Sequence, residues 1–280
     1  MSLYIMEYCQ LSYKRSTIGY YRFGKGPSPA ICFHGYGEDG TSFAFLEKYA
    51  SDQFSFIAID LPFHGKTEWN EGLNFPNSDL LQIIKEILEK EYLKLNTQNL
   101  KLTLLGFSLG GRIALSLYQE LSNKTERMML MAPDGLKINF WYWLSTQTGL
   151  GNRLFRYTMK HPGWFFGFLK LLNKLGMVNA SIFKFVNYYI GDRDVRRLLY
   201  ERWTCLRKLK PHIKRIKLFI RNNKTKTRLI YGKHDRIITT ARGNKFTKGI
   251  EELCTVTIIQ SGHQVLHEKH VAELLPLFRD

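Results

Sequence analysis

The stretch Gly106-Phe107-Ser108-Leu109-Gly110 sets one serine between two glycines, each two residues away. It follows the apolar run 100–105 (LKLTLL) and precedes 111–118 (GRIALSLY), whose apolar residues recur at helical spacing. Glycines in these positions allow a strand to turn sharply into a helix and leave the serine hydroxyl exposed at the turn. About one chain in ten of this length would contain the pattern by chance. The strand–helix context therefore favours a nucleophilic serine over an incidental one in a glycine-rich turn.

Apolar runs alternate with amphipathic segments on both sides of this stretch. The chain has 280 residues, of which 44% are hydrophobic and 23% charged, which excludes intrinsic disorder and suits one large domain or a domain with an insertion. Helical spacing is clearest over 79–95, and residues 1–25 have the pattern of an edge hairpin. Continuous apolar strands between amphipathic helices indicate a parallel sheet covered on both faces. The strand candidates are 30–33, 54–60, 100–107, 127–132, 228–231 and 255–259. We predict an α/β fold with a mostly parallel, doubly wound sheet.

The segment between the fourth and fifth strands breaks this alternation. Residues 164–175 predict an amphipathic helix, and His161-Pro162 before it suits a helix start. We expect an inserted helical cap over 136–225, with 1–135 and 226–280 forming the core.

A nucleophilic serine needs a histidine base and an acid that orients it. His263 follows the last apolar run in Ser-Gly-His, and His267 is the second candidate. For the acid, Asp235 follows the fifth strand, while Asp134 follows the fourth in a Pro-Asp-Gly turn. Ser108, Asp235 and His263 have the chain order nucleophile, acid, base, which favours Asp235.

Acyl transfer also needs N–H donors for the developing oxyanion. Leu109 follows the nucleophile and supplies one N–H at the start of its helix. His34-Gly35-Tyr36-Gly37 follows the first strand candidate, and the N–H of Tyr36 is the expected second donor.

With HGYG, DLPFHGKT, GFSLGG, YGKHD and SGHQVLHE in this order, the whole chain resembles the α/β-hydrolase fold superfamily, in its esterase- and lipase-like, capped form. The resemblance implies Ser108, Asp235 and His263 as the triad and Tyr36 and Leu109 as the oxyanion hole, with no cofactor and no metal. The superfamily writes the second motif as D-x-P-G-H-G-x-S. Asp60 and Gly65 match it, whereas Phe63 replaces a glycine and Thr67 a serine, and His64 is expected to pack in the turn rather than act as a base.

The resemblance leaves the reaction open. We expect a serine hydrolase that acts on a carboxylic ester or thioester through an acyl-enzyme; an aspartate nucleophile would be needed for haloalkane or epoxide hydrolysis. Arg112 resembles an arginine of 2-succinyl-6-hydroxy-2,4-cyclohexadiene-1-carboxylate synthase, a lyase, and could bind a substrate carboxylate. Its alternative role is to pair with a nearby acid. A non-catalytic binding protein is the third class, although no triad member is missing.

Positive charge is concentrated in one segment. The chain has 41 Lys and Arg against 24 Asp and Glu, and 137–228 contains 21 of the basic residues but three acids. Four of the five tryptophans lie there, among them Trp164, a candidate substrate contact. This composition fits contact with an anionic membrane or an anionic acyl substrate, or else a solvated face over an aromatic core. Nucleic acid binding is not expected, because no nucleic-acid-binding motif accompanies the charge.

Four scattered cysteines and the absence of an export-signal pattern favour the cytoplasm, with peripheral contact at the inner membrane surface. The oligomeric state is not determined by any of these patterns.

Overall fold

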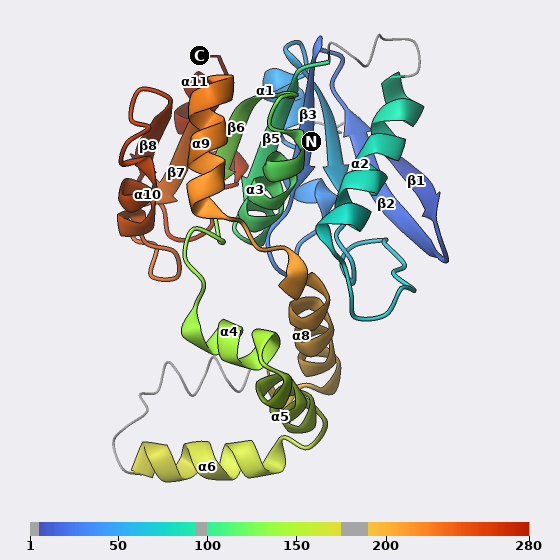
Figure 1. The fold of residues 1–280 in the computed structure, drawn as a ribbon, viewed down its shortest axis with the longest axis vertical. Helices are drawn as coiled ribbons and strands as arrows, with labels where there is room; N and C mark the ends of the chain where they lie inside the picture. The colour runs from blue at the N-terminus through green and yellow to red at the C-terminus, as the bar shows by residue number, and fades with distance from the viewer. Residues whose placement is uncertain (1–5, 93–99, 175–189, 280) are drawn as a thin grey trace. The chain divides into compact units, whose positions relative to one another are not determined.

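The computed structural model describes residues 6–92, 100–174 and 190–279. It contains one sheet of eight strands in the order β1-β2-β4-β3-β5-β6-β7-β8 (Figure 1). β1 and β2 pair antiparallel, β2 also pairs antiparallel with β4, and the remaining pairs are parallel. The predicted edge hairpin and mostly parallel sheet are therefore confirmed. The strands are β1 (Glu7–Tyr13), β2 (Ser16–Phe23), β3 (Ser28–Phe33), β4 (Phe54–Ile59), β5 (Leu102–Phe107), β6 (Thr125–Met131), β7 (Lys226–Gly232) and β8 (Cys254–Ile259).

The chain divides into two compact units, which we call the core unit (residues 1–71, 76–137 and 209–280) and the helical unit (72–75 and 138–208). In the core unit, α2, α3 and α9 lie on one face of the sheet (Figure 1). Leu46 of α1 and Leu274 and Phe278 of α11 join a buried cluster with strand residues such as Phe56 and Met129. Helices thus cover both faces. The helices of this unit are α1 (Leu46–Ala50), α2 (Asn77–Tyr92), α3 (Leu109–Leu121), α9 (Ile213–Asn223), α10 (Thr240–Thr247) and α11 (Val271–Arg279), with 3-10 turns η1 (Gly40–Phe43) and η3 (Glu268–His270).

The helical unit consists of α4 (Phe140–Gln147), α5 (Gly149–Lys160), α6 (Gly163–Lys174), α8 (Arg193–Cys205) and the 3-10 turn η2 (Leu206–Lys208). Polar side chains begin three of its helices. Asn139 accepts hydrogen bonds from the first turn of α4, Thr148 from that of α5, and Asp192 from that of α8. Aromatic rings join the helices: Phe155 of α5 contacts Tyr200 and Trp203 of α8. The unit therefore has an aromatic interior of its own.

The expected cap of 136–225 extends further toward the C-terminus than the helical unit, which ends at residue 208. α9 belongs to the core unit, where its Ile216 and Ile220 are fully buried. The main-chain N–H of His212, just before α9, donates to the side chain of Gln119 on α3 at 2.7 Å. The apolar stripe of α9 thus contributes to the packing of the sheet, which a charge boundary in the sequence does not reveal. The predicted helices 79–95 and 164–175 correspond to α2 and α6; residues 93–95 and 175 lie outside the described residues.

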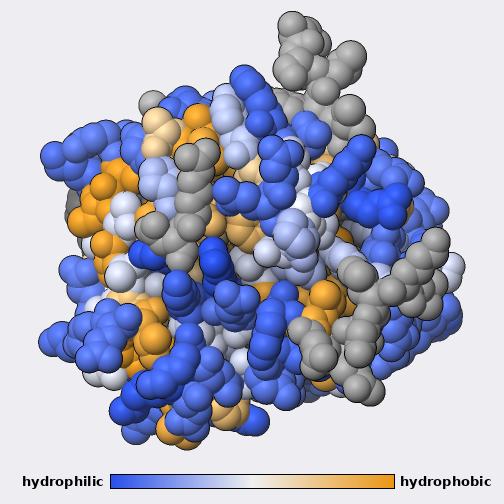
Figure 2. Space-filling view, turned by 90° about the horizontal axis from the view of Figure 1, so that it is seen from above, coloured by the Kyte–Doolittle hydropathy of each residue, from blue (hydrophilic) through white to orange (hydrophobic). Residues whose placement is uncertain are grey.

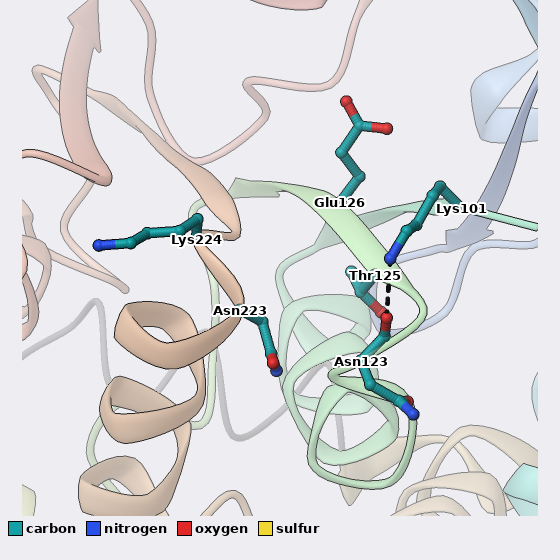
Figure 3. A pocket seen from close by; sticks show the side chains of 6 residues that line it. All are labelled: Lys101, Asn123, Thr125, Glu126, Asn223 and Lys224. Carbon is teal, nitrogen blue, oxygen red and sulfur yellow. Dashed lines mark hydrogen bonds between the residues drawn. The ribbon is translucent and has the colours of Figure 1, made fainter. Parts of the chain in front are cut away.

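The end of the sheet at which the parallel strands begin, that of their amino termini, is polar. Figure 2 shows this end of the core unit, where hydrophilic residues predominate and hydrophobic ones form small separate patches. A hollow of about 310 Å³ lies there between the starts of β5, β6 and β7 (Figure 3). Within it the Lys101 ammonium donates to the main-chain carbonyl of Asn123 at 3.1 Å. Its lining residues are Lys101, Asn123, Thr125, Glu126, Asn223 and Lys224.

Candidate active site

Ser108, His263 and Asp235 form a hydrogen-bonded chain at the opposite end of the sheet, where the parallel strands have their carboxyl ends. The Ser108 Oγ lies 3.0 Å from Nε2 of His263, and the His263 Nδ1 lies 2.7 Å from Oδ2 of Asp235. Because the carboxylate accepts, Nδ1 carries the proton and Nε2 is left to accept from the serine hydroxyl. The structure thus brings together three residues separated by up to 155 positions in the sequence.

The turn that carries Ser108 is strained. Ser108 has φ 50° and ψ −112°, a conformation that costs a non-glycine residue about 1 to 3 kcal/mol. The positions of Gly106 and Gly110 have no room for a side chain. A Cβ on Gly106 would lie 2.5 Å from the Gly110 carbonyl oxygen, and a Cβ on Gly110 would lie 1.8 Å from that of Phe33. The Ser108 N–H donates to the Met131 carbonyl at 2.9 Å, which helps to hold the turn.

Asp235 is held in place by its own loop. Its side chain is completely buried, and its Oδ1 accepts from the N–H groups of Ile237 at 2.7 Å and Ile238 at 3.0 Å. The other oxygen, Oδ2, is thereby aimed at His263. Each oxygen of the carboxylate has a separate and fixed set of donors.

Asp134, the competing acid, has a different partner. Its Oδ2 lies 2.7 Å from the Arg112 guanidinium, and its Oδ1 accepts from the N–H of Gly135. No hydrogen bond joins it to His263 among the described residues. Arg112 is itself buried. Of the two roles expected for Arg112, the ion pair with Asp134 corresponds to pairing with a nearby acid.

The two expected oxyanion donors belong to different segments, Leu109 to the turn of Ser108 and Tyr36 to the loop after β3. Leu109 is the first residue of α3, so its N–H has no carbonyl partner within the helix and lies at the positive end of the helix dipole. Tyr36 lies in the loop after β3, and its ring contacts that of His64 edge-on at 6.0 Å.

Three side chains, those of His34, Glu38 and Gln264, fix the Tyr36 loop, and no spacing or periodicity in the sequence indicates this role. His34 is fully buried; its Nδ1 donates to the Gly35 carbonyl at 2.7 Å, and its Nε2 accepts from the N–H of Leu61 at 3.1 Å. The Glu38 carboxylate accepts from the N–H of Gly35 at 3.1 Å and from the Gln264 side-chain amide at 3.0 Å. Since Gln264 follows His263, Glu38 joins the Tyr36 loop to the loop of His263.

The DLPFHGKT segment has a structural role. Asp60 is buried and accepts from the N–H groups of Gly40 and Lys66, both at 2.7 Å, while burial raises the pKa of its carboxyl. Thr67 makes the turn hydrogen bonds expected of the serine that it replaces: its hydroxyl donates to the Asp60 carbonyl at 2.7 Å and accepts from the N–H of Gly19. Phe63, where the superfamily has glycine, has a left-handed φ of 63°. The motif keeps its shape at the cost of strain at this residue.

The other candidates lie elsewhere. His64 is buried, and its Nδ1 bonds to the Pro62 carbonyl at 2.9 Å. His267 begins η3, where its Nδ1 accepts from the N–H of Lys269. Trp164 lies on α6, in the helical unit, and its ring contacts Phe165. Among the residues that the structure describes, no three His, Cys, Asp or Glu side chains are grouped as metal ligands.

Comparison with known proteins agrees with this architecture. A family model described as serine aminopeptidase, S33, matches residues 29–270. The hydrolase YugF of Bacillus subtilis, itself uncharacterised, is 26% identical over 110 residues, which are 39% of this chain and 38% of that protein. The chain thus matches less than two fifths of the length of this relative.

Solved structures share the fold at low identity. A thermophilic esterase of Thermogutta terrifontis has a TM-score of 0.67 at 13% identity, over 98% of this chain and 97% of that one. A carboxylesterase of Nitrososphaera gargenis has a TM-score of 0.65 at 17% identity, over 97% of each chain. The predicted α/β-hydrolase fold is confirmed. Because the family match covers residues 29–270, from β3 to η3 and thus most of the chain, this chain belongs to the serine aminopeptidase S33 family of α/β-hydrolases.

Proposed function

We propose that the protein is a serine hydrolase that cleaves a carboxylic ester or thioester through an acyl-enzyme, with Ser108 as nucleophile, His263 as base and Asp235 as orienting acid. The observation that supports this proposal is the hydrogen-bonded chain from the Ser108 hydroxyl through His263 to the buried Asp235 carboxylate. Its three members have the charges and hydrogen-bonding roles that acyl transfer requires.

In the first half of the reaction, Ser108 Oγ attacks the acyl carbon and its proton passes to Nε2 of His263. Asp235 stabilises the imidazolium that forms, and this effect is strong because the carboxylate is excluded from water. The N–H groups of Leu109 and Tyr36 donate to the oxyanion of the tetrahedral intermediate. Collapse of this intermediate expels the alcohol or thiol, which takes the proton from Nε2.

In the second half, a water molecule gives its proton to His263 Nε2 and attacks the acyl-enzyme. The oxyanion forms at the same donors, and the proton returns to Ser108 Oγ as the acid product leaves. No other group on the protein has to change its protonation state.

The alternatives have less support. The lyase alternative requires Arg112 to bind a substrate carboxylate. It has less support because Arg112 already pairs with the carboxylate of Asp134. A binding protein without activity would have no need for the strained conformation of Ser108.

The test combines labelling with turnover. Intact-mass and peptide mass spectrometry after a fluorophosphonate probe should place a single adduct on Ser108, and p-nitrophenyl esters and thioesters of increasing chain length should be hydrolysed. Absence of both the adduct and turnover on every ester and thioester would reject the proposal.

A further inference from the structure

Large hydrophobic side chains are exposed on the helical unit. Ten of them lie within residues 138–171, whereas the described part of the core unit exposes three: Leu218, Ile237 and Ile258. The hydrophobic patches on the face of the core unit in Figure 2 are small and separate. Contiguous apolar surface on a folded protein indicates an interaction site. The ten are Ile138, Phe140, Trp141, Trp143, Leu150, Leu154, Tyr157, Trp164, Phe168 and Leu171.

On α5 the exposed residues form one stripe. Leu150, Leu154 and Tyr157 recur at i, i+4 and i+7 and are 81%, 52% and 55% exposed. The opposite side of the helix, with Phe155, packs against rings of α8. α5 is thus a well-packed helix that keeps a second apolar stripe toward solvent.

α6 repeats the same arrangement. Trp164, Phe168 and Leu171 again recur at i, i+4 and i+7, and each is about half exposed, while Leu169 on another side is buried. Two successive helices with the same outward stripe are unusual for a solvated surface, on which scattered single hydrophobic residues are the norm.

Only cations accompany these stripes. Residues 138–191 contain no Asp or Glu at all. On α5, Arg153 and Lys160 are exposed and lie three residues from members of the stripe, while Arg156 is exposed on another side of the helix. On α6, Lys174 is exposed and lies three residues from Leu171, while Lys170 is exposed on another side of the helix. The surface is therefore apolar and positive at once.

The arginines of α8 are less suited to an external partner. The Arg196 guanidinium donates to the main-chain carbonyls of Met159, Ile190 and Gly191. Arg197 pairs with Asp194 at 3.5 Å and Glu201 at 4.0 Å. The positive charge of the helical unit that faces solvent beside apolar stripes is that of α5 and α6.

We propose that the exposed faces of α5 and α6 bind the surface of an anionic lipid bilayer, with the apolar stripes in the headgroup–acyl boundary and the lysines and arginines on lipid phosphates. Interfacial helices bind in this way, with Trp, Phe and Leu beside Lys and Arg. A second copy of the chain would meet the same acid-free, positive face and be repelled, and nucleic acid offers no apolar layer for the stripes. Within the described residues no helix is long and apolar enough to span a bilayer.

The charge arm of the test uses cosedimentation with vesicles of phosphatidylglycerol and phosphatidylcholine. The wild-type chain should bind mixed vesicles at low salt, bind pure phosphatidylcholine far less, and be released as salt rises. At about fivefold per basic residue, Arg153→Glu with Lys160→Glu should weaken binding at least about 30-fold. The control is Lys85→Glu with Lys245→Glu, which changes the net charge equally at exposed positions of the core unit and should have a small effect.

The apolar arm uses Leu150→Ser with Leu154→Ser, which should weaken binding about tenfold or more, because each leucine loses its transfer into the bilayer. The matched control removes exposed apolar side chains from the core unit, Leu218→Ser with Ile258→Ser, and should bind as the wild type does. Trp164 provides a direct readout: brominated lipid should quench the part of the tryptophan emission that is absent in a Trp164→Phe variant. Circular dichroism and thermal melting of each variant show whether the helices persist.

Several results would overturn the proposal: no binding, equal salt-independent binding to neutral vesicles, equal loss in the test and control variants, or a dimer in light scattering that depends on Leu150 and Leu154. The proposal does not rest on the proposed function. Binding is measured with Ser108→Ala as well as with the wild-type chain, so failure of catalysis and failure of membrane binding are separate outcomes.

Discussion

The exchange of Asp235 for asparagine tests the geometry of the site most directly. Oδ1 of Asp235 already accepts two main-chain N–H groups, at 2.7 and 3.0 Å. An asparagine will therefore keep its oxygen there and turn its NH₂ group toward His263 Nδ1. Two donors cannot face each other, so the imidazole must take the tautomer with its proton on Nε2. That nitrogen can then no longer accept the Ser108 proton.

The expected loss is large. A wrong histidine tautomer in a serine triad costs about 10⁴ in turnover, which corresponds to about 5 kcal/mol of transition-state stabilisation. The matched control is Asp134→Asn, which keeps an oxygen for only one of its two partners, Arg112 or the Gly135 N–H, but breaks no hydrogen bond to His263, and we expect a change in turnover of less than about tenfold. The assay is kcat/KM on the best p-nitrophenyl ester, with the rate of fluorophosphonate labelling and the thermal midpoint of both variants. Activity within tenfold of wild type for Asp235→Asn, or a crippled Asp134→Asn, would refute the reasoning.

Three further outcomes are expected. Ser108→Ala should lower ester turnover by about 10⁴ to 10⁶ with little change in Tm; a tenth of wild-type activity would be incompatible with Ser108 as nucleophile. Gly110→Ala should destabilise the fold by about 3 kcal/mol or more, because its Cβ would lie 1.8 Å from the Phe33 carbonyl oxygen; an unchanged urea midpoint would contradict this. Burial lowers the pKa of His270, so on acidification the unfolded chain takes up this proton before the folded chain does, and the free energy of unfolding should fall as the pH drops below about 6.5. His270→Leu should reduce this dependence of the unfolding free energy on pH, measured by urea titrations between pH 5 and 7.5. An identical pH dependence in the variant would exclude His270 as its source.

Much of the fold and of the candidate site can be predicted from the sequence because the signals are local. Strand and helix periods are visible over a few residues, and a glycine on each side of Ser108 is required where α3 approaches β5, at Gly106, and β3, at Gly110. The order of Ser108, Asp235 and His263 along the chain follows from where successive parallel strands end. The replacement of a glycine by Phe63 is visible in the sequence, but its left-handed φ is not.

The tertiary structure decided what depends on contacts between distant segments. Asp134 and Asp235 both follow strands, and only their surroundings distinguish them: Arg112 pairs with Asp134, while two main-chain N–H groups aim Asp235 at His263. The link from Glu38 to Gln264 spans 226 positions and leaves no periodic signal. α9 is basic like the helices before it, yet its buried isoleucines pack in the core unit, to which α9 therefore belongs. Likewise the apolar residues of α5 occur on two sides of the helix, and packing against α8 determines which side is buried and which stripe is left for a partner.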